Sequence, residues 1–456
     1  MGSVGSLVHQ LSPVDHLSPR VHVPKLLYFA SEEEPEVIAN TLREGLAKSI
    51  SALPILGGSV GLMRGAAQKG TLAIQAPFFS ADDILSVKDV RSNYDFADTK
   101  ARHFPPDAVD GELFAAEVKA NPSRVLLAQA NIIRGGVVLV FAIHHCVVDE
   151  TGIFNVVKLW STFCSGDDDS GLVKREWIDR APLMKGEGMG RLADHPEYNL
   201  LPEEKSATHE TKASEYISKT SDTSSSAIFF FSDDSLGRLK AAAGKGADGN
   251  WISTNNALCA LIWGRVTNAR RTVGMGDAKY SMFNMIVNGR RRMDPPVSDE
   301  YMGNVVFVSK AAHSLDALTS TSSLPDIASM IRKSVLEVDN KAIKDKIKAV
   351  SSVEDIGRLA PGGYNSFQRN VGCTSWANQA YYSLNWGKVL GGKCERVRWR
   401  KTISDGIFVI FPRITSEVGL EAGGSGLEVY LGLQHEHLEC LRKDEVFNQY
   451  AEWRCS

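Results

Sequence analysis

Histidine and aspartate side chains follow an apolar run in the first half of the chain. Residues 144–149 read His-His-Cys-Val-Val-Asp, and residues 137–143 before them read Val-Val-Leu-Val-Phe-Ala-Ile. Such a run is typical of a buried strand, so it predicts an imidazole at the edge of a core. Because a histidine titrates near pH ~6.5, it can take up and return a proton at neutral pH. The pattern therefore indicates an enzyme that uses a histidine as acid or base.

The sequence leaves the arrangement of His145 and Asp149 open. In a helical turn, residues i and i+4 share a face, and Asp149 would orient the imidazole. In a loop after the strand, the two side chains would point apart. A further alternative is a buried structural histidine whose ring bonds the backbone. His144 is a competing candidate, but neighbouring side chains on a strand end face opposite sides, so only one of the two histidines can reach a given cavity.

Strands and helices alternate around this motif and along the rest of the chain. We predict strands at 26–29, 124–133, 137–143, 227–231, 281–287, 407–411 and 427–433. We predict helices at 35–53, at 150–163, from Ser232 or Asp233 onward, after a cap at Ser253-Thr254, and at 325–338. Since both kinds of element occur in both halves, the fold class is α/β or α+β.

Length and composition predict two domains. The chain has 456 residues, of which 43% are hydrophobic and 23% are charged. That length exceeds what one hydrophobic core usually organises. Residues 185–225 are polar and rich in Ser, Thr, Lys and Glu. We interpret them as an exposed linker between an N-terminal domain, 1–184, and a C-terminal domain, 226–456.

Charge and cysteine usage limit the partners and the compartment. The net charge of −3 creates no positive field that would attract nucleic acid or an anionic membrane. No apolar run approaches the roughly 18 residues of a membrane helix, and no secretory signal pattern is present. The seven cysteines are odd in number and contain no CxxC, which favours reduced thiols. We therefore expect a cytoplasmic monomer that has no nucleic-acid or membrane partner.

The letters around His145 resemble those of the BAHD acyl-CoA-dependent acyltransferases, in which HHxxxD follows a strand and precedes a helix that contains a tryptophan. Further segments resemble the family in the family's order. They are LSPVDHLSPRVHVPKLLYF at 11–29, LREGLAKSISALPILGG at 42–58, STNNALCALIWGRVTNAR at 253–270, VNGRRRMDPP and YMGNVV within 287–306, TSWANQAYYSLNWGKV at 374–389, and GLEVYLGLQHEHLECLRKDEVF at 426–447. The resemblance implies two chloramphenicol-acetyltransferase-like domains, each a mixed sheet flanked by helices, with a solvent channel between them.

The resemblance also implies roles for single residues. His145, which is in the HxxxD register, would be the general base. Asp149 would be structural and would pair with an arginine, which we expect to be Arg290. Thr374 and Trp376 match family positions near the developing oxyanion.

Coenzyme contacts follow from the same resemblance. Ser253 and Thr254 match positions that often contact the coenzyme, and we count Arg290 among the candidates for coenzyme binding as well. The implied cosubstrate is an acyl-CoA, with acetyl-CoA as the expected donor, and no tightly bound cofactor is expected.

Three positions depart from the family's pattern. Glu150 stands where a glycine usually follows the motif aspartate, and Asn288 stands in place of an aspartate. Asn385-Trp386-Gly387 replaces DFGWG, a segment that is implied to shape the second domain. These variants resemble the fungal branch of the family, which includes the trichothecene O-acetyltransferases.

Other chemistry-bearing residues have simpler explanations. His435 and His437, if they lay on one strand face, could bind zinc, but no third ligand is near in sequence, so we expect no metal. Cys146 is expected to be a small core residue. The tryptophans expected in the core are Trp263, Trp386 and Trp399.

The predicted function is transfer of an acyl group, most simply acetyl, to a hydroxyl of a specialised metabolite. His145 would deprotonate the alcohol, and the acyl group would pass directly to it within a ternary complex. Two rivals use the same motif, namely an amine acceptor and a condensation-type enzyme with a carrier-bound acyl donor. A rival of another class is a scaffold that catalyses cyclisation or isomerisation, or that only binds.

Overall fold

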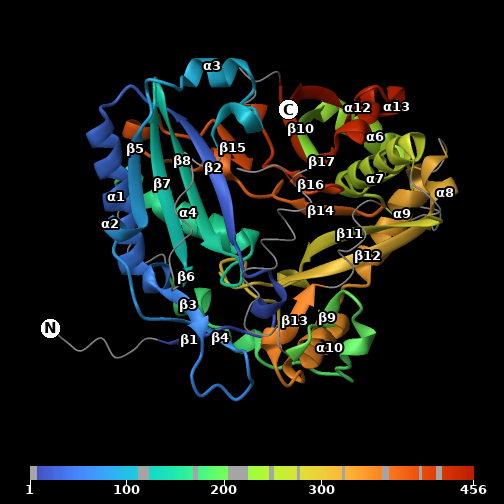
Figure 1. The fold of residues 1–456 in the computed structure, drawn as a ribbon, viewed down its shortest axis with the longest axis horizontal. Coiled ribbons are helices and arrows are strands. Elements are labelled where there is room, and N and C mark those ends of the chain that lie inside the picture. Colours follow the sequence, from blue (N-terminus) through green and yellow to red (C-terminus); the bar gives the residue numbers. More distant parts are fainter. Residues whose placement is uncertain are drawn as a thin grey trace.

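The computed structural model describes most of the chain. The described ranges are 8–110, 123–167, 173–203, 224–245, 251–274, 278–320, 324–361, 369–399, 403–416 and 424–456. Two large sheets stand side by side, and a smaller group of elements lies below them in the view of Figure 1. Among the described residues, no helix has the length and apolar character needed to cross a bilayer.

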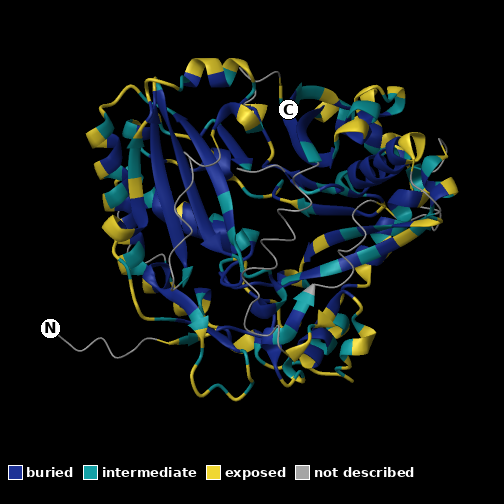
Figure 2. Ribbon diagram, viewed as in Figure 1, coloured by how far each residue is buried: buried dark blue, intermediate teal, exposed yellow. Residues whose placement is uncertain are grey.

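The first sheet holds the strand that ends in the histidine motif. Its five strands have the order β15-β2-β8-β7-β5. Their bounds are Arg396–Trp399 for β15, His22–Ala30 for β2, Gly136–His144 for β8, Leu126–Ile133 for β7 and Leu85–Asp89 for β5. Every residue of β7 and β8 is buried, which explains why both strands read as near-continuous apolar runs (Figure 2).

Helices α1 and α4 cover this sheet and were both expected from the sequence. Helix α1 spans Pro35–Ala52 and α4 spans Glu150–Ser165. Asp149 caps α4 by accepting a hydrogen bond from the Gly152 amide, and Gly166 ends the helix in a left-handed conformation. Shorter helices, α2 at Ala81–Ile84 and α3 at Phe96–Ala101, complete this part of the chain.

The second sheet has seven strands in the order β12-β11-β14-β16-β17-β10-β18. Their bounds are Val306–Ser314, Tyr280–Asn288, Val371–Ser375, Ile407–Ile410, Gly426–Gln434, Ser224–Ser232 and Glu452–Cys455, in that spatial order. The larger helices on it are α6 at Asp233–Ala243, α7 at Thr254–Val273, α9 at Leu324–Leu336 and α12 at His435–Arg442. The smaller ones are α8 at Leu315–Thr319 and α13 at Glu445–Asn448.

The two faces of the second sheet pack against different partners. One face shares a core with α6, α7, α9 and α12, through residues such as Phe229 and Phe283. The opposite face contributes Phe230, Val409 and Tyr430 to the core of the first sheet. Alternation along the strands therefore ties the two sheets together.

Two small sheets lie below the larger ones in the view of Figure 1. One has the order β1-β4-β3-β6, with strands His9–Gln10, Leu72–Gln75, Ser59–Leu62 and Ser123–Arg124. The other pairs β9, Tyr198–Leu200, with β13, Leu359–Pro361, beside helix α10, Asn340–Ser351 (Figure 1).

The stretch that we predicted to be an exposed linker is folded in its first part. Tyr198 is buried, β9 pairs with β13, and Gly190 donates a backbone hydrogen bond to Asp345 on α10. Residues 185–203 are held in place by contacts to residues that are distant in sequence. Such contacts require no periodic pattern of apolar residues, so the sequence does not predict them. The rest of the predicted linker, 204–223, lies outside the described residues. Strand β15 also crosses the predicted division, because it pairs with β2 of the N-terminal half.

Candidate active site

A cavity of about 440 Å³ lies between the two sheets. His145, Glu150 and Ile153 line it from the end of β8 and the start of α4. Strands β11, β12 and β14 line the opposite wall, with side chains that include Asn284, Val306 and Thr374. Most of the lining is apolar, and its polar groups include His145, Glu150, Glu197 and Lys310. We call this space the central cavity.

His145 reaches the central cavity from the turn after β8. Its amide bonds the Val21 carbonyl at 2.8 Å, and its ring Nδ1 lies 3.1 Å from the Val148 carbonyl. Because a carbonyl only accepts hydrogen bonds, Nδ1 of the neutral ring must carry the proton. Nε2 is then the unprotonated nitrogen, which is the form that a general base requires. Burial lowers the pKa of His145, so the ring is neutral at pH 7.

His144 is turned away from the central cavity. It is buried, its Nδ1 lies 2.9 Å from Cys146 Sγ, and its ring meets the edge of the His22 ring. Cys146 is itself fully buried in the core, as we predicted. Of the two adjacent histidines, the structure therefore places His145 in the cavity wall.

Asp149 and Arg290 form a buried ion pair. Arg290 donates to both carboxylate oxygens of Asp149, at 2.7 and 2.9 Å, and to the carbonyls of Tyr301 and Gly303. Asp149 also accepts from the amides of Gly152 and Val305. The sequence left two arrangements of His145 and Asp149 open. The structure shows the second, in which Asp149 points away from the His145 imidazole. The predicted pairing is present.

The coenzyme-binding role that we also gave Arg290 is wrong. Arg290 is 0% exposed, and its guanidinium is used by Asp149 and two backbone carbonyls. A group enclosed in this way offers no face to a ligand. The sequence showed three consecutive arginines but could not show which one is buried.

A second set of polar contacts fixes the backbone of the motif and was missed from the sequence. Asn304 donates from Nδ2 to the His145 carbonyl and to Asp15, both at 3.0 Å. Asp15 is fully buried and pairs with Arg180 at 3.1 Å. The signal was available, since Asp15 and Asn304 lie in the LSPVD and YMGN segments that we noted without giving them a role.

Thr374 and Trp376 lie at the end of β14 and line the same cavity as His145. Trp376 is 2% exposed, and its ring stacks on Trp399 with centroids 5.4 Å apart. Trp399, which we expected to be a core residue, also lines the central cavity. Trp399 packs against the core of the first sheet, as predicted, and it also reaches the cavity because β15 pairs with β2, which the sequence does not reveal.

Glu150, the residue in place of the family's glycine, sits in a charged cluster in this wall. Its carboxylate lies 2.7 Å from Lys25 Nζ and accepts a hydrogen bond of 2.9 Å from the Tyr381 hydroxyl. The Lys25 ammonium lies 2.9 Å from the centroid of the Trp376 ring. We predicted no role for Lys25 from the sequence. Lys25 alternates with Val23 and Leu27 along its strand, so it occupies a position that faces the core.

Ser253 and Thr254 lie away from the central cavity. Ser253 caps α7, which packs on the face of β11 that carries Phe283 and Met285. The cavity is lined by Met282, Asn284 and Ile286 on the opposite face of that strand. The structure therefore does not bring the two predicted coenzyme contacts together with His145.

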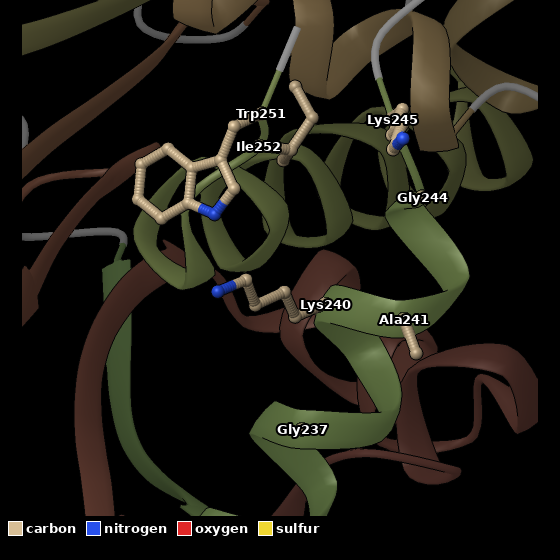
Figure 3. A pocket seen from close by; sticks show the side chains of 7 residues that line it. All are labelled: Gly237, Lys240, Ala241, Gly244, Lys245, Trp251 and Ile252. Carbon is tan, nitrogen blue, oxygen red and sulfur yellow. The ribbon is translucent and has the colours of Figure 1, made fainter. Parts of the chain in front are cut away.

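A second, open pocket of about 380 Å³ is lined in part by Trp251 and Ile252, the two residues that precede Ser253. It is lined by Lys240, Lys245, Trp251 and Ile252, together with residues of α6 (Figure 3). Trp251 is 58% exposed, and the Lys240 ammonium reaches to 4.9 Å from its ring centroid. The pocket thus offers an aromatic face and two cations to a ligand.

The remaining candidates do not form sites. His435 and His437 lie at the start of helix α12 and not on a strand, which removes the basis of the zinc alternative. Among the described residues, no group of three metal-ligating side chains occurs. Trp263 and Trp386 are fully buried, as predicted. Trp386 packs on Phe29 and Trp160, so the segment that we expected to shape the second domain supports the first sheet instead.

The family pattern described as the Transferase family matches residues 6–447, and the chain belongs to this family. It is 23% identical to the eremophilane O-acetyltransferase prx11 of Penicillium rubens, over 98% of both chains. It is 25% identical to the trichothecene 8-O-acetyltransferase of Fusarium sporotrichioides, over 96% of both chains.

The fold matches that of a solved relative. F. sporotrichioides TRI101, solved with coenzyme A and T-2, superposes with a TM-score of 0.80 at 21% identity, over 98% of this chain and 100% of that chain. The predicted BAHD membership and two-domain α/β fold are confirmed.

Proposed function

We propose that this protein is an acyl-CoA-dependent O-acyltransferase that acts on a hydroxyl of a specialised metabolite, with acetyl-CoA as donor. The observation that carries the proposal is His145, whose Nδ1 is tied to the Val148 carbonyl so that Nε2 is the basic nitrogen beside the central cavity. Relatives named as O-acetyltransferases of eremophilane and trichothecene metabolites support the reaction class. The apolar cavity wall, with Ile153 and Val306, supports a largely apolar acceptor.

The transfer proceeds in one ternary complex. Nε2 of His145 takes the proton of the acceptor hydroxyl while the hydroxyl oxygen attacks the thioester carbonyl, which contributes a factor of about 10²–10⁴. The Thr374 hydroxyl or the Trp376 indole N–H donates to the resulting oxyanion. When the C–S bond breaks, His145 returns the proton to the departing thiolate. The products are an ester and free coenzyme A.

The coenzyme's nucleotide end is assigned to the open pocket beside Ser253 and Thr254. Lys240 and Lys245 supply charge for phosphates, and Trp251 supplies a face for a base. Lys240→Ala should therefore raise the KM for acetyl-CoA while kcat stays unchanged, because Lys240 does not line the central cavity.

The molecule is proposed to act as a monomer in the cytoplasm, with domains at 1–184 and 226–456. All seven cysteines are free, which suits a reducing compartment. Elution at about one chain mass in light-scattering chromatography supports the monomer, and elution as a dimer contradicts it.

The reaction is tested by following thiol release from acetyl-CoA with a panel of sesquiterpenoid alcohols, while product is measured by mass spectrometry. We expect coenzyme A and ester to appear in equal amounts. Transfer only to amines, or only from a carrier-bound acyl group, would replace the proposal with one of its rivals. Product formed without release of coenzyme A would indicate a non-transfer reaction.

A further inference from the structure

Lysine and glutamate side chains from two elements meet at the wall of the central cavity. Lys25 lies on β2, whose other inward residues, Val23, Leu27 and Phe29, belong to the apolar core. Lys25 is 0% exposed, and Glu150 is 16% exposed at its side chain. Placing two charges in such a position costs free energy that a leucine would not cost.

The ammonium of Lys25 fixes the Trp376 ring from one side. Lys25 Nζ lies 2.9 Å from the centroid of that ring, and Trp399 stacks on the same ring at 5.4 Å with an interplanar angle of 22°. Lys25 and Trp399 are direct partners across β2 and β15. The strand pair β2–β15 of the first sheet thus supplies both groups that hold the indole of Trp376. Trp376 itself follows β14 of the second sheet.

Glu150 in turn fixes Lys25. Its Oε2 lies 2.7 Å from the ammonium, and the Tyr381 hydroxyl donates to Oε1 at 2.9 Å. Glu150 immediately follows Asp149, so the pair is anchored to the segment that carries His145. The chain from His145 through Glu150 and Lys25 to Trp376 is continuous in space.

We infer that Lys25 and Glu150 form a positioning pair, in which the Lys25 cation orients and polarises the Trp376 indole beside His145, and that turnover depends on this charge. A cation on the π-face draws electron density from the indole, which strengthens its N–H as a donor. The inference rests on the proposed acyl transfer, in which Trp376 is one of the two donors to the oxyanion. Lys25 touches no substrate and acts through Trp376.

The charge of Lys25 changes within an accessible pH range. Burial lowers the pKa of Lys25 to about 8, and the adjacent Glu150 carboxylate opposes that shift. Burial raises the pKa of Glu150, and burial also raises that of Tyr381 far enough to keep the phenol neutral. These are the titratable groups that face Lys25 among the described residues. The cation is therefore present at neutral pH and is lost as the pH rises through about 8.

The first test observes the indole directly and does not depend on turnover. Protein labelled with ¹⁵N-tryptophan is titrated from about pH 6.5 to about pH 9.5 by NMR, and Trp376→Phe assigns the signal. We expect the Trp376 N–H signal to shift with a midpoint near 8, and to lose this titration in Lys25→Met and in Lys25→Arg. The surface variant Lys48→Met should behave as wild type. A signal that titrates equally in Lys25→Met overturns the inference.

The second test measures the consequence for turnover. In the wild type, kcat should fall above the midpoint and level off near the value for Lys25→Met, whereas Lys25→Arg should retain its rate. Glu150→Gln should move the fall to lower pH, because the carboxylate no longer supports the cation. Lys25→Met should lower kcat at pH 7 and leave the KM for acetyl-CoA unchanged, as expected for an interaction made in the transition state.

The outcomes separate the inference from the proposed function. A fall in rate above pH 8 that persists in Lys25→Arg overturns the positioning role. If no acceptor is acylated at all, the proposed function has failed, while the NMR titration still decides whether Lys25 acts on Trp376. Thermal melts of each variant exclude loss of folded protein as the cause of a lower rate.

Discussion

At the scale of single residues, the chemistry depends on which nitrogen of His145 is free. The Val148 carbonyl fixes the proton on Nδ1, and the Asn304 amide holds the His145 carbonyl from the other side. The ring is held by a backbone carbonyl and the backbone of His145 by the Asn304 side chain, so neither hydrogen bond is made by the Asp149 carboxylate. In the proposed mechanism, catalysis and support are thus separate tasks for the histidine and the aspartate of the motif.

In the proposed mechanism His145 takes up the acceptor proton, so replacing His145 by alanine should lower kcat by a factor of about 10²–10⁴. The melting temperature should change little, since the ring is only half-buried. Steady-state thiol release and a thermal melt measure the two quantities. His435→Ala, an exposed histidine on α12, is the matched control and should match wild type.

The pH dependence of kcat/KM follows from the same residue. Because burial lowers the pKa of His145, the base is already unprotonated below its usual range. Activity should rise with pH along a limb whose midpoint lies below about 6.5, the value for a free histidine. A midpoint well above this value, measured with saturating acetyl-CoA, would contradict the assignment of His145 as the general base.

At the scale of secondary elements, the start of α4 is the critical support. Asp149 caps the helix, neutralises Arg290 and accepts from the Val305 amide, so one side chain joins α4 to the second sheet. The close approach of α4 to the segment around Met302 depends on Gly152, where an added Cβ would meet the Met302 carbonyl oxygen at 2.2 Å.

Replacing Asp149 by alanine should destabilise the protein by about 3–5 kcal/mol, since it leaves a buried guanidinium without its counter-ion. Arg291→Ala is the natural comparison, because Arg291 pairs with Asp299 at an exposed position next to Arg290. Denaturant unfolding of the two variants should give a large loss for the first and a small change for the second. Equal stabilities would show that the buried pair is not a support.

Replacing Gly152 by alanine should also destabilise the protein, because the helix must move away from a backbone carbonyl that cannot yield. Gly237→Ala on α6 is the matched control, since nothing lies within 4 Å of its added Cβ. There the higher helix propensity of alanine should raise stability by up to about 1 kcal/mol. Thermal melts of both variants give the comparison, and a stabilised Gly152→Ala would be inconsistent with the close approach.

At the scale of the whole molecule, the two sheets share one core. Val397 of β15, Tyr430 of β17 and Trp386 all belong to the cluster that contains β2, β7 and β8. Strand β15 completes the edge of the first sheet although it follows β14 of the second sheet in sequence. The central cavity is lined by residues of both sheets, so it is formed only when both halves are in place.

Calorimetry of the intact chain should therefore show one cooperative unfolding transition. Residues 1–184 expressed alone should not fold stably, because they lack β15 and expose the surface that Tyr430 and Trp386 cover. Circular dichroism and dispersion of NMR signals would measure this. Two well-separated transitions, or a folded N-terminal fragment, would show that the sheets are independent.

Much of the fold was predictable because its signals are local. The apolar runs of β7 and β8, the periodicity of α1 and the caps at Ser232 and Ser253 each depend on a few neighbouring residues. Long-range pairing was not predictable, and it decided the place of β15, the packing of 185–203 and the surroundings of Trp399. Arg290 was expected to bind the coenzyme and is instead enclosed, because its burial also depends on long-range contacts that the sequence does not show.

The sequence by itself determined the positions of most strands and helices, the family, and the presence of a histidine after a buried strand. Each of these depends on a pattern of residues that are close together in the sequence. Only the tertiary structure decided that His145 and not His144 faces the cavity, that Asp149 turns to Arg290, and that Lys25 lies on Trp376. The physical reason is that burial, charge pairing and ring orientation depend on residues that are more than one hundred positions apart in the chain and meet only after the two sheets have packed.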